Sequence, residues 1–224
     1  MENQSWEKIL LRICKKKKID SIGYIHATMP FWHLNYYQTK SFNQKNIYLP
    51  NKIFTVSKIN LELLLNQGIR KNKLKLVEAL RYNWLNNVKK EKFSNSSNKI
   101  LVFGDYERIS NEKLLKLVKK FLKDEKNLII YFKVHPGDIT KYNSENKRLR
   151  IINDFPKKIK FKFFIFSNST SASAEYSHLT DKIAIYKPND SINLSPFKNL
   201  KNQNIFFSNV SELSNIINSR VKKK

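Results

Sequence analysis

YFKVHPGD, residues 131–138, carries a hydrophobic, strand-like run into a histidine and a proline and ends there. FKFFIFSNSTSASAEY, residues 161–176, repeats the pattern and ends in a cluster of hydroxyl residues. In an open parallel sheet, ligands bind outside the carboxyl ends of the strands. The two stretches therefore predict a parallel sheet with a ligand site at one edge, formed by the ends of neighbouring strands.

Strands and helices alternate from residue 100 onward, a pattern typical of a doubly wound parallel sheet. The helix over residues 110–125 has Ser110 or Asn111 as its predicted N-cap. Strands are predicted within residues 100–106, 127–136, 161–166, 182–188 and 204–208, and further helices within 169–179 and 210–224. This part of the chain is therefore predicted to be a complete Rossmann-like domain.

The first part of the chain is also α/β but shows only two clear strands, over residues 21–25 and 52–56. An amphipathic helix precedes them, since four apolar residues recur at helical spacing: Trp6, Ile9, Leu10 and Ile13. Residues 86–99 are polar and low in complexity, as linkers are. We predict a partial Rossmann-like domain over 1–88, a linker over 89–99 and the complete domain over 100–224.

Composition predicts a globular, cytoplasmic protein. With 224 residues, 41% of them hydrophobic, the chain can bury a sizeable core. A single cysteine, Cys14, excludes an internal disulfide and fits a reducing compartment. No run reaches the roughly 20 apolar residues that cross a bilayer, and the acid-before-base order of the first residues is the reverse of a signal peptide.

The net charge of +25 suggests nucleic acid or anionic lipid as a partner. Two observations favour a compositional cause instead. The lysines are scattered through a chain that is rich in Lys, Asn and Ile throughout, as an AT-rich genome would encode. No zinc knuckle, aromatic RNA-binding strand or Gly-rich basic arm is present. Nucleic acid is therefore not the expected partner.

The hydroxyls of Ser169, Thr170 and Ser171 precede a predicted helix, whose free N–H groups and positive dipole end attract phosphate. His135, with Lys133 and Pro136 beside it, could donate a hydrogen bond to the same phosphate. Glu175 could accept one from ribose hydroxyls. The alternatives are structural, because a Ser/Thr cluster often caps a helix and a His-Pro pair often ends a strand.

Further candidates lie in other predicted loops. His26 follows a strand and could act as a general base toward an acceptor hydroxyl, unless it is only a polar member of an aromatic-rich loop; Glu2 is a second candidate base. Gly104 allows close backbone approach, and Asp105 could cap a helix or bind the ligand. Three more residues are predicted to line the cleft: Thr28, Asn193 and Ser195. No GxGxxG motif or metal-ligand spacing is present, so neither a cofactor nor a metal is expected.

KVHP (133–136) with SNSTSASAE (167–175) resembles the His-Pro and Ser-Ser/Thr pair of GT-B glycosyltransferases that use cytidine-nucleotide donors, such as bacterial sialyltransferases and capsule Kdo transferases. In those families the pair holds the donor phosphate. The segments ENQSWEKILL (2–11), GYIHATMPFWHLNYY (23–37), VEALRY (77–82) and INLSPF (192–197) are similar to a bacterial surface-carbohydrate biosynthesis family of GT-B type.

HATMP (26–30) is similar to the His-Gly-Thr-Pro of CDP-glycerol glycerophosphotransferases, whose histidine is thought to act as a base. Here Ala27 replaces the glycine and Met29 is inserted. The resemblance implies a metal-independent enzyme with two Rossmann-like domains, of which this chain would be the C-terminal portion, with or without activity of its own.

The first hypothesis is a glycosyltransferase, or part of one, that takes a sugar from a CMP- or CDP-type donor in surface polysaccharide synthesis. Its partners would be a nucleotide sugar and a glycan or lipid-linked acceptor. The rival is a basic protein that binds nucleic acid or an anionic membrane without catalysis. A third reading places the helix near Trp6 on the inner membrane leaflet, although such an apolar stripe more commonly belongs to a core.

Overall fold

The computed structural model describes residues 3–30, 34–36, 49–78, 94–156, 158–177, 180–195, 197 and 205–221. The chain divides into two compact units, Met1–Trp84 and Leu85–Lys224. Residues 89–93 of the predicted linker lie outside the described residues, and its bounds of 89–99 stay a prediction. Within the described residues, no helix is long and apolar enough to cross a membrane.

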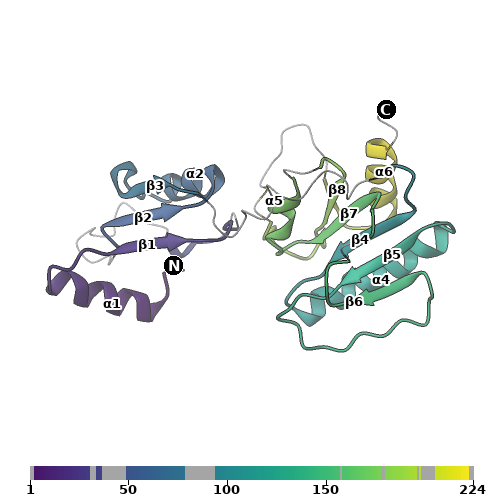
Figure 1. The fold of residues 1–224 in the computed structure, drawn as a ribbon, viewed down its shortest axis with the longest axis horizontal. Helices are drawn as coiled ribbons and strands as arrows, with labels where there is room; N and C mark the ends of the chain where they lie inside the picture. The colour runs from purple at the N-terminus through teal and green to yellow at the C-terminus, as the bar shows by residue number, and fades with distance from the viewer. Residues whose placement is uncertain are drawn as a thin grey trace. The chain divides into compact units, whose positions relative to one another are not determined.

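The first unit is built on a parallel sheet of three strands in the order β1-β2-β3 (Figure 1). The strands are β1 (Ile22–Ile25), β2 (Lys52–Thr55) and β3 (Leu74–Leu76), with α1 (Ser5–Lys16), η1 (Leu34–Tyr36), α2 (Lys58–Asn66) and η3 (Lys71–Lys73) around them. Only two strands were expected. The third was missed because it is three residues long and none of its side chains is buried.

Alternate residues of β1 and β2 form a small core with α2 and the loop after β1, as half-buried strands do. Its members are Ile25, Met29, Tyr36, Ile53, Leu63, Leu64 and Ile69. Ser57 caps α2, because its hydroxyl accepts a hydrogen bond from the backbone N of Asn60 at 3.1 Å.

Helix α1 begins where the sequence predicts, but its apolar stripe is not part of the core. None of its residues is buried. The partly covered face consists of Glu7, Leu11 and Cys14, whereas Trp6 and Ile13 are exposed. The expectation that the stripe packs inward is wrong, because the helix turns a different face toward its own unit.

The second unit contains a parallel sheet of six strands in the order β6-β5-β4-β7-β8-β9 (Figure 1). The strands are β4 (Lys99–Phe103), β5 (Ile129–Lys133), β6 (Leu149–Ile152), β7 (Phe163–Ser167), β8 (Ile183–Tyr186) and β9 (Phe206–Phe207). Strand β6 was not predicted, because its sequence, LRII, is short and carries an arginine. The order is that of a Rossmann-like fold, as expected.

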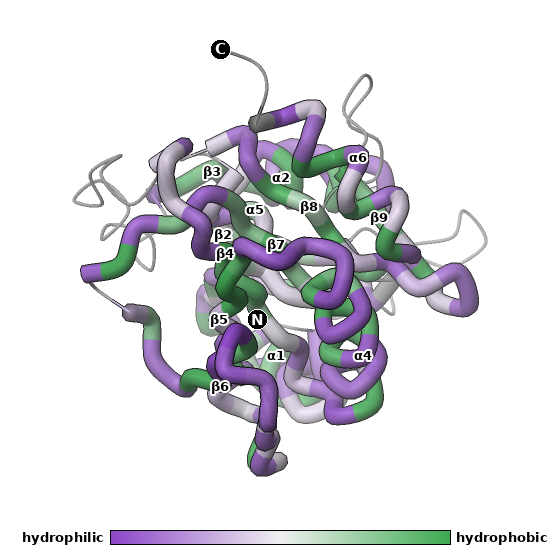
Figure 2. Tube along the Cα trace, turned by 90° about the vertical axis from the view of Figure 1, so that its right-hand side faces the viewer, coloured by the Kyte–Doolittle hydropathy of each residue, from purple (hydrophilic) through white to green (hydrophobic). Residues whose placement is uncertain are grey.

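Helices cover both faces of this sheet, and alternate strand residues face one side or the other. The helices are α4 (Arg108–Asp124), α5 (Ala172–Ser177) and α6 (Val210–Val221). On one face, Val118 and Phe121 of α4 and Ile216 of α6 pack on the strands. On the other, Tyr176 of α5 packs with Phe164 and Phe166. Figure 2 shows hydrophilic and hydrophobic residues in alternation along α4, as expected of a helix with one side on a sheet.

Candidate functional site

The loops after β4, β5 and β7 meet at the carboxyl edge in the middle of the second sheet. From β4 the chain runs outward to β5 and β6 and then returns to β7 on the other side of β4. This reversal of strand order is where open α/β sheets bind ligands. The sequence predicted that β5 and β7 are neighbours. This prediction is wrong, because β4 lies between them and pairs with both. The loop after β4 therefore lies between the loops that carry His135 and Ser169.

A buried carboxylate, that of Asp105, occupies this central position. The hydroxyl of Ser167 donates to its Oδ2 at 3.1 Å, and the hydroxyl of Ser169 donates to the same oxygen. The backbone N of Glu107 donates to its Oδ1 at 3.2 Å. Asp105 thus fastens the loop after β4 to the end of β7, and in this structure the Ser169 proton is directed at a carboxylate.

The side chain of Asn111 fixes the loop that contains Asp105 by hydrogen bonds to its backbone. It is fully buried, and its Oδ1 accepts from the backbone N of Asp105 at 2.7 Å while its Nδ2 donates to the backbone O at 2.8 Å. The same Nδ2 donates to Asp138 Oδ2 at 2.6 Å. The predicted capping role is wrong for both Ser110 and Asn111, because α4 begins at Arg108 with Glu107 as N-cap. Asn111 lies within the helix and reaches back to the loop.

Gly104 is buried beneath the same loop. A Cβ atom there would lie 2.6 Å from Asn111 Oδ1 and 3.1 Å from the Phe132 ring. The missing side chain is therefore required by packing inside the protein. Its predicted role in admitting a ligand stays a prediction.

Asp138 ties the loop after β5 to the same network. Its Oδ2 accepts from the Tyr142 hydroxyl at 2.7 Å, and its Oδ1 from the backbone N of Thr140 at 2.9 Å. Burial raises the pKa of Asp138, but the hydrogen bonds from Tyr142, Thr140 and Asn111 outweigh it and lower the pKa to about 2. The carboxylate is therefore ionised and engaged with its own loop.

His135 has a defined ring orientation. The backbone N of Gly137 donates to Nδ1 at 3.0 Å, and a neutral imidazole that accepts at Nδ1 carries its proton on Nε2. The ring lies edge-on to Tyr106, with 6.4 Å between the centroids. Tyr106, from the loop after β4, is exposed. A hydrogen-bond donor and an accessible aromatic ring thus lie together at the sheet edge.

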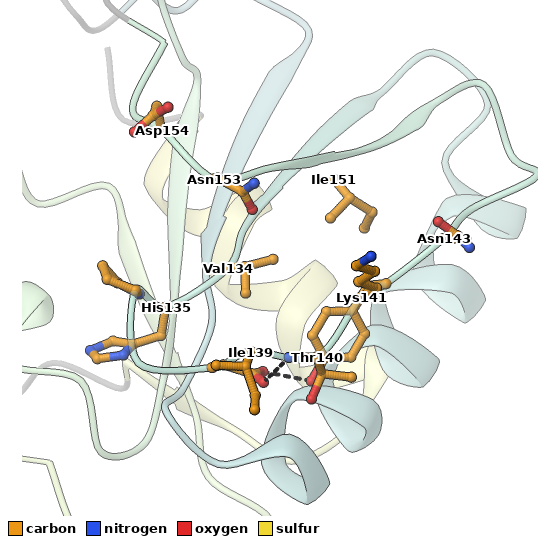
Figure 3. Close-up of a pocket in the computed structure, with 12 residues that line it drawn as sticks. Val134, His135, Ile139, Thr140, Lys141, Asn143, Ile151, Asn153 and Asp154 are labelled. Atoms are coloured by element: carbon orange, nitrogen blue, oxygen red, sulfur yellow. Dashed lines mark hydrogen bonds between the residues drawn. The ribbon is translucent and has the colours of Figure 1, made fainter.

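A cavity of about 610 Å³ opens beside these loops, at the ends of β5 and β6. Figure 3 shows the His135 ring turned away from Thr140, Lys141 and Ile151, which line the cavity. Exposed Pro136 also lines it. His135 is nevertheless one of the residues that line the cavity, so the cavity reaches the loop that carries this ring.

Lys133 ends β5, and its ammonium group donates to Val134 O at 3.4 Å. Burial lowers the pKa of Lys133, and the charge of Asp154 partly opposes this shift.

Thr170 and Ser171 form the start of α5. Thr170 Oγ1 accepts from the backbone N of Ala172 at 3.4 Å, and Ser171 O accepts from the backbone N of Ala174 at 3.0 Å. Glu175 follows within the helix and is half-buried. The local geometry therefore matches the helix-capping alternative, while binding of a ligand by these residues stays a prediction.

The loop that contains Asn193 and Ser195 is pinned to the end of β7 by Asn168. Asn168 Nδ2 donates to Ile192 O at 2.6 Å, and its Oδ1 accepts from the backbone N of Leu194 at 3.2 Å. Asn193 and Ser195 direct polar atoms at their own loop: Asn193 Oδ1 accepts from Ser195 N, and Ser195 Oγ from Phe197 N. The loop is therefore held beside the segment that contains Ser169, while a cleft role for Asn193 and Ser195 stays a prediction.

In the first unit, His26 is exposed at the carboxyl end of β1, and Thr28 is half-buried in the same loop. Asn60 of α2 fixes this loop: its Oδ1 accepts from Met29 N and its Nδ2 donates to Ala27 O, both at 2.8 Å. Glu2 lies outside the described residues.

Sequence reasoning missed Tyr106, Asn168 and Asn60, and it gave Asn111 only a capping role. For Asn111 a signal was present. The residues Asn111, Leu114, Leu115 and Val118 recur at helical spacing, so an amide stands on the core-facing side of α4. A buried side-chain amide needs hydrogen-bond partners. The nearest backbone N–H and C=O groups outside the helix are those of the loop before it.

No family model matches this sequence, and no curated protein is significantly similar to it. Solved structures do resemble the fold. They include the UDP-GlcNAc 2-epimerase of Methanocaldococcus jannaschii in complex with UDP-GlcNAc and UDP, with 19% identity, a TM-score of 0.57 and 96% of this chain covered. The UDP-bound MnaA of S. aureus (12% identity, TM-score 0.51, 95% covered) and the UDP-N-acetylglucosamine 2-epimerase of Rickettsia bellii (11%, 0.53, 96%) are also similar.

The chain spans 66%, 62% and 62% of the lengths of these three proteins. Epimerases of this kind share the GT-B fold with glycosyltransferases. The chain is therefore an α/β protein of GT-B type, with one Rossmann-like domain and a second, partial one, as the sequence predicts.

Proposed function

We propose that this chain is a nucleotide-sugar-binding part of an enzyme, and that the nucleotide binds at the carboxyl edge of the second sheet. The observation that carries the proposal is the meeting of His135, Asp105 and Ser169 at the point where the strand order reverses. The fold is shared with proteins whose structures contain UDP or UDP-GlcNAc, which supports the same class of ligand here.

In this proposal His135 donates its Nε2–H to a phosphate oxygen, and Tyr106 offers a ring face for a base or sugar. Asp105 accepts from hydroxyls, as it does from those of Ser167 and Ser169. After β7, the hydroxyls of Thr170 and Ser171 would bind the phosphate, and Glu175 would accept a hydrogen bond from a ribose hydroxyl. Lys133 lies beside this edge, and its positive charge favours an anion.

The finer form of the proposal is sugar transfer from a CMP- or CDP-type donor to a glycan or lipid-linked acceptor in surface polysaccharide synthesis. It rests on the His-Pro and Ser-Thr-Ser pattern. His26 would then remove the acceptor proton, with Glu2 as the second candidate; removal of a general base typically lowers turnover by 10²–10⁴-fold.

Calorimetric titration with CMP, CDP, UDP and GDP tests the proposal. Replacing His135 by Ala, and Ser169 with Thr170 by Ala, should each weaken nucleotide binding by about 1–3 kcal/mol, because each removes hydrogen bonds to a charged group. The corresponding free nucleoside lacks the phosphate and should bind all variants alike. Ser96→Ala, an exposed serine before β4 and so at the opposite end of the strands, is the matched control.

Failure of all four nucleotides to bind would refute the proposal. So would variants that bind like the parent but melt at lower temperature, because His135 and Thr170 would then only end a strand and cap a helix. Binding that weakens steeply with salt and extends to any nucleic acid would favour the rival, since phosphate-backbone contacts release counterions.

A further inference from the structure

Helix α1 carries a contiguous apolar stripe on its outer face. Trp6 is 65% exposed, Ile9 62%, Leu10 52% and Ile13 48%. Single exposed hydrophobic residues are ordinary on protein surfaces, but four in one row on one helix mark an interaction site.

Basic residues follow along one side of this stripe. At 100° per residue, Glu7, Leu11 and Cys14 mark the face toward the unit, and Trp6, Leu10 and Ile13 mark the stripe beside it. The next side of the helix carries Ser5 and four basic residues, namely Lys8, Arg12, Lys15 and Lys16. An apolar stripe bordered by basic residues is the pattern of helices that lie in the plane of a membrane surface.

The positive surface continues beyond the helix, onto the residues around β2 and η3. Burial lowers the pKa of Lys73, and the charges of Lys15, Arg70 and Lys52 lower it further. The ammonium groups of Lys73 and Lys52 donate to the carbonyls of Pro50 and Asn72, at 2.9 and 2.8 Å. These partners are neutral, so the hydrogen bonds leave the positive charge in place.

Among the residues that the structure describes, Glu7 and Asp20 are acidic residues of this region. Glu7 in the first turn of α1 accepts from the backbone N of Gln4 at 2.8 Å, and Asp20 accepts from Asn51 Nδ2 at 2.6 Å. Four basic residues stand against one acidic residue within α1, so the helix carries a net positive charge next to its apolar stripe.

We propose that α1 docks this chain on an anionic lipid bilayer, with the stripe in the headgroup region and the cations on lipid phosphates. The basic residues extend from α1 to Lys52 and Arg70. A charged area of this width fits the broad anionic surface of a bilayer better than it fits a partner protein whose groove would hold α1 alone. The proposal goes beyond nucleotide-sugar binding and does not depend on it, because every residue in it lies in the first unit.

Cosedimentation of the full chain with vesicles tests the docking. At low salt, the chain should bind vesicles of phosphatidylcholine with about a third phosphatidylglycerol, and not phosphatidylcholine alone. Trp6→Glu with Ile9→Glu should abolish binding. Lys16→Ala with Lys17→Ala should weaken it about 25-fold, since each basic residue near such a surface contributes about fivefold.

Matched controls come from the second unit. Ile139 is 96% exposed and stands apart from the stripe, so Ile139→Glu should bind vesicles like the parent. Lys119→Ala with Lys123→Ala removes two exposed charges from α4 and should have little effect. Because Trp6, Ile9, Lys16 and the C-cap residue Lys17 are all exposed, the variants should melt like the parent, and they should also bind nucleotide like the parent.

Trp6 can report its own position. In a chain with Trp32→Phe and Trp84→Phe, lipids brominated on their acyl chains should quench Trp6 fluorescence. Absence of binding to anionic vesicles at low salt would overturn the proposal, as would equal loss of binding in the Ile139 variant. Shielding of Trp6 by self-association or by a protein partner, with no lipid needed, would also overturn it and identify a protein interface instead.

Discussion

Replacement of Asn111 by Ala should destabilise the second unit by about 2–5 kcal/mol. The side chain is fully buried and satisfies both the backbone N and the backbone O of Asp105, at 2.7 and 2.8 Å. Each buried group left without a partner costs about 1–3 kcal/mol. Asp138 would also lose the amide that donates to it at 2.6 Å.

Asn111→Asp gives a sharper result because it keeps the shape and removes only the donor. The new carboxylate would face the Asp105 carbonyl and the Asp138 carboxylate, so the pKa of the pair would rise above its unfolded value. The folded variant would then bind more protons than the unfolded chain, and its stability would increase as the pH falls from about 7 toward 5. Asn111→Ala should show no such gain.

Hydrogen exchange of β4 and β5 amides is the suitable assay. The three tryptophans, Trp6, Trp32 and Trp84, all lie in the first unit, so fluorescence would not report on the second. Asn143→Ala, in an exposed loop position, is the control. A loss below about 1 kcal/mol for Asn111→Ala, or an Asp variant that does not respond to acid, would refute the view that Asn111 holds the site loops.

Two further predictions concern the same loops. Gly104→Ala places a Cβ 2.6 Å from Asn111 Oδ1, so we expect a loss of about 1–3 kcal/mol, measurable as a lower melting temperature; an unchanged temperature would show that Asn111 moves away freely. Since the pKa of Asp138 is lowered to about 2, its contribution is present at neutral pH and lost as the pH falls through that value. Asp138→Asn should therefore reduce stability at neutral pH and flatten its dependence on acid, as denaturant titrations at several pH values would show.

The fold was predictable because the long central strands are continuous hydrophobic runs. The residues FFIFS of β7 are all buried, and such runs occur in parallel sheets that are covered on both faces. The short edge strands were not predictable. β3 and β6 carry a lysine and an arginine and take their strand geometry from the neighbours with which they pair.

The candidate site was predictable only in outline. His135 and Ser169 were identified from their places after hydrophobic strands, but that both flank β4 depends on strand order, which local sequence does not encode. The role of Asn111 likewise depends on the loop before it. The direction of the α1 stripe depends on which helix face meets the rest of the unit, and two faces of that helix carry apolar residues.

The bond between Ser169 and Asp105 decides how a phosphate can be held at this edge. A phosphate placed on the Ser169 hydroxyl would stand close to the Asp105 carboxylate, and two like charges about 4 Å apart repel by about 4 kcal/mol near a protein surface. A phosphate on the Nε2–H of His135 would meet no such repulsion from the group bonded to Nδ1, because that group is the neutral backbone N–H of Gly137. If Ser169 stays on Asp105, it does not contact the phosphate, so replacing Ser169 should weaken binding little and its effect should simply add to that of the His135 variant. If Ser169 turns to the phosphate, both groups grip one anion and their losses should be coupled. The double-variant cycle therefore measures where the phosphate lies, and coupling would mean that the ligand supplies Asp105 with a hydroxyl in place of the one it loses.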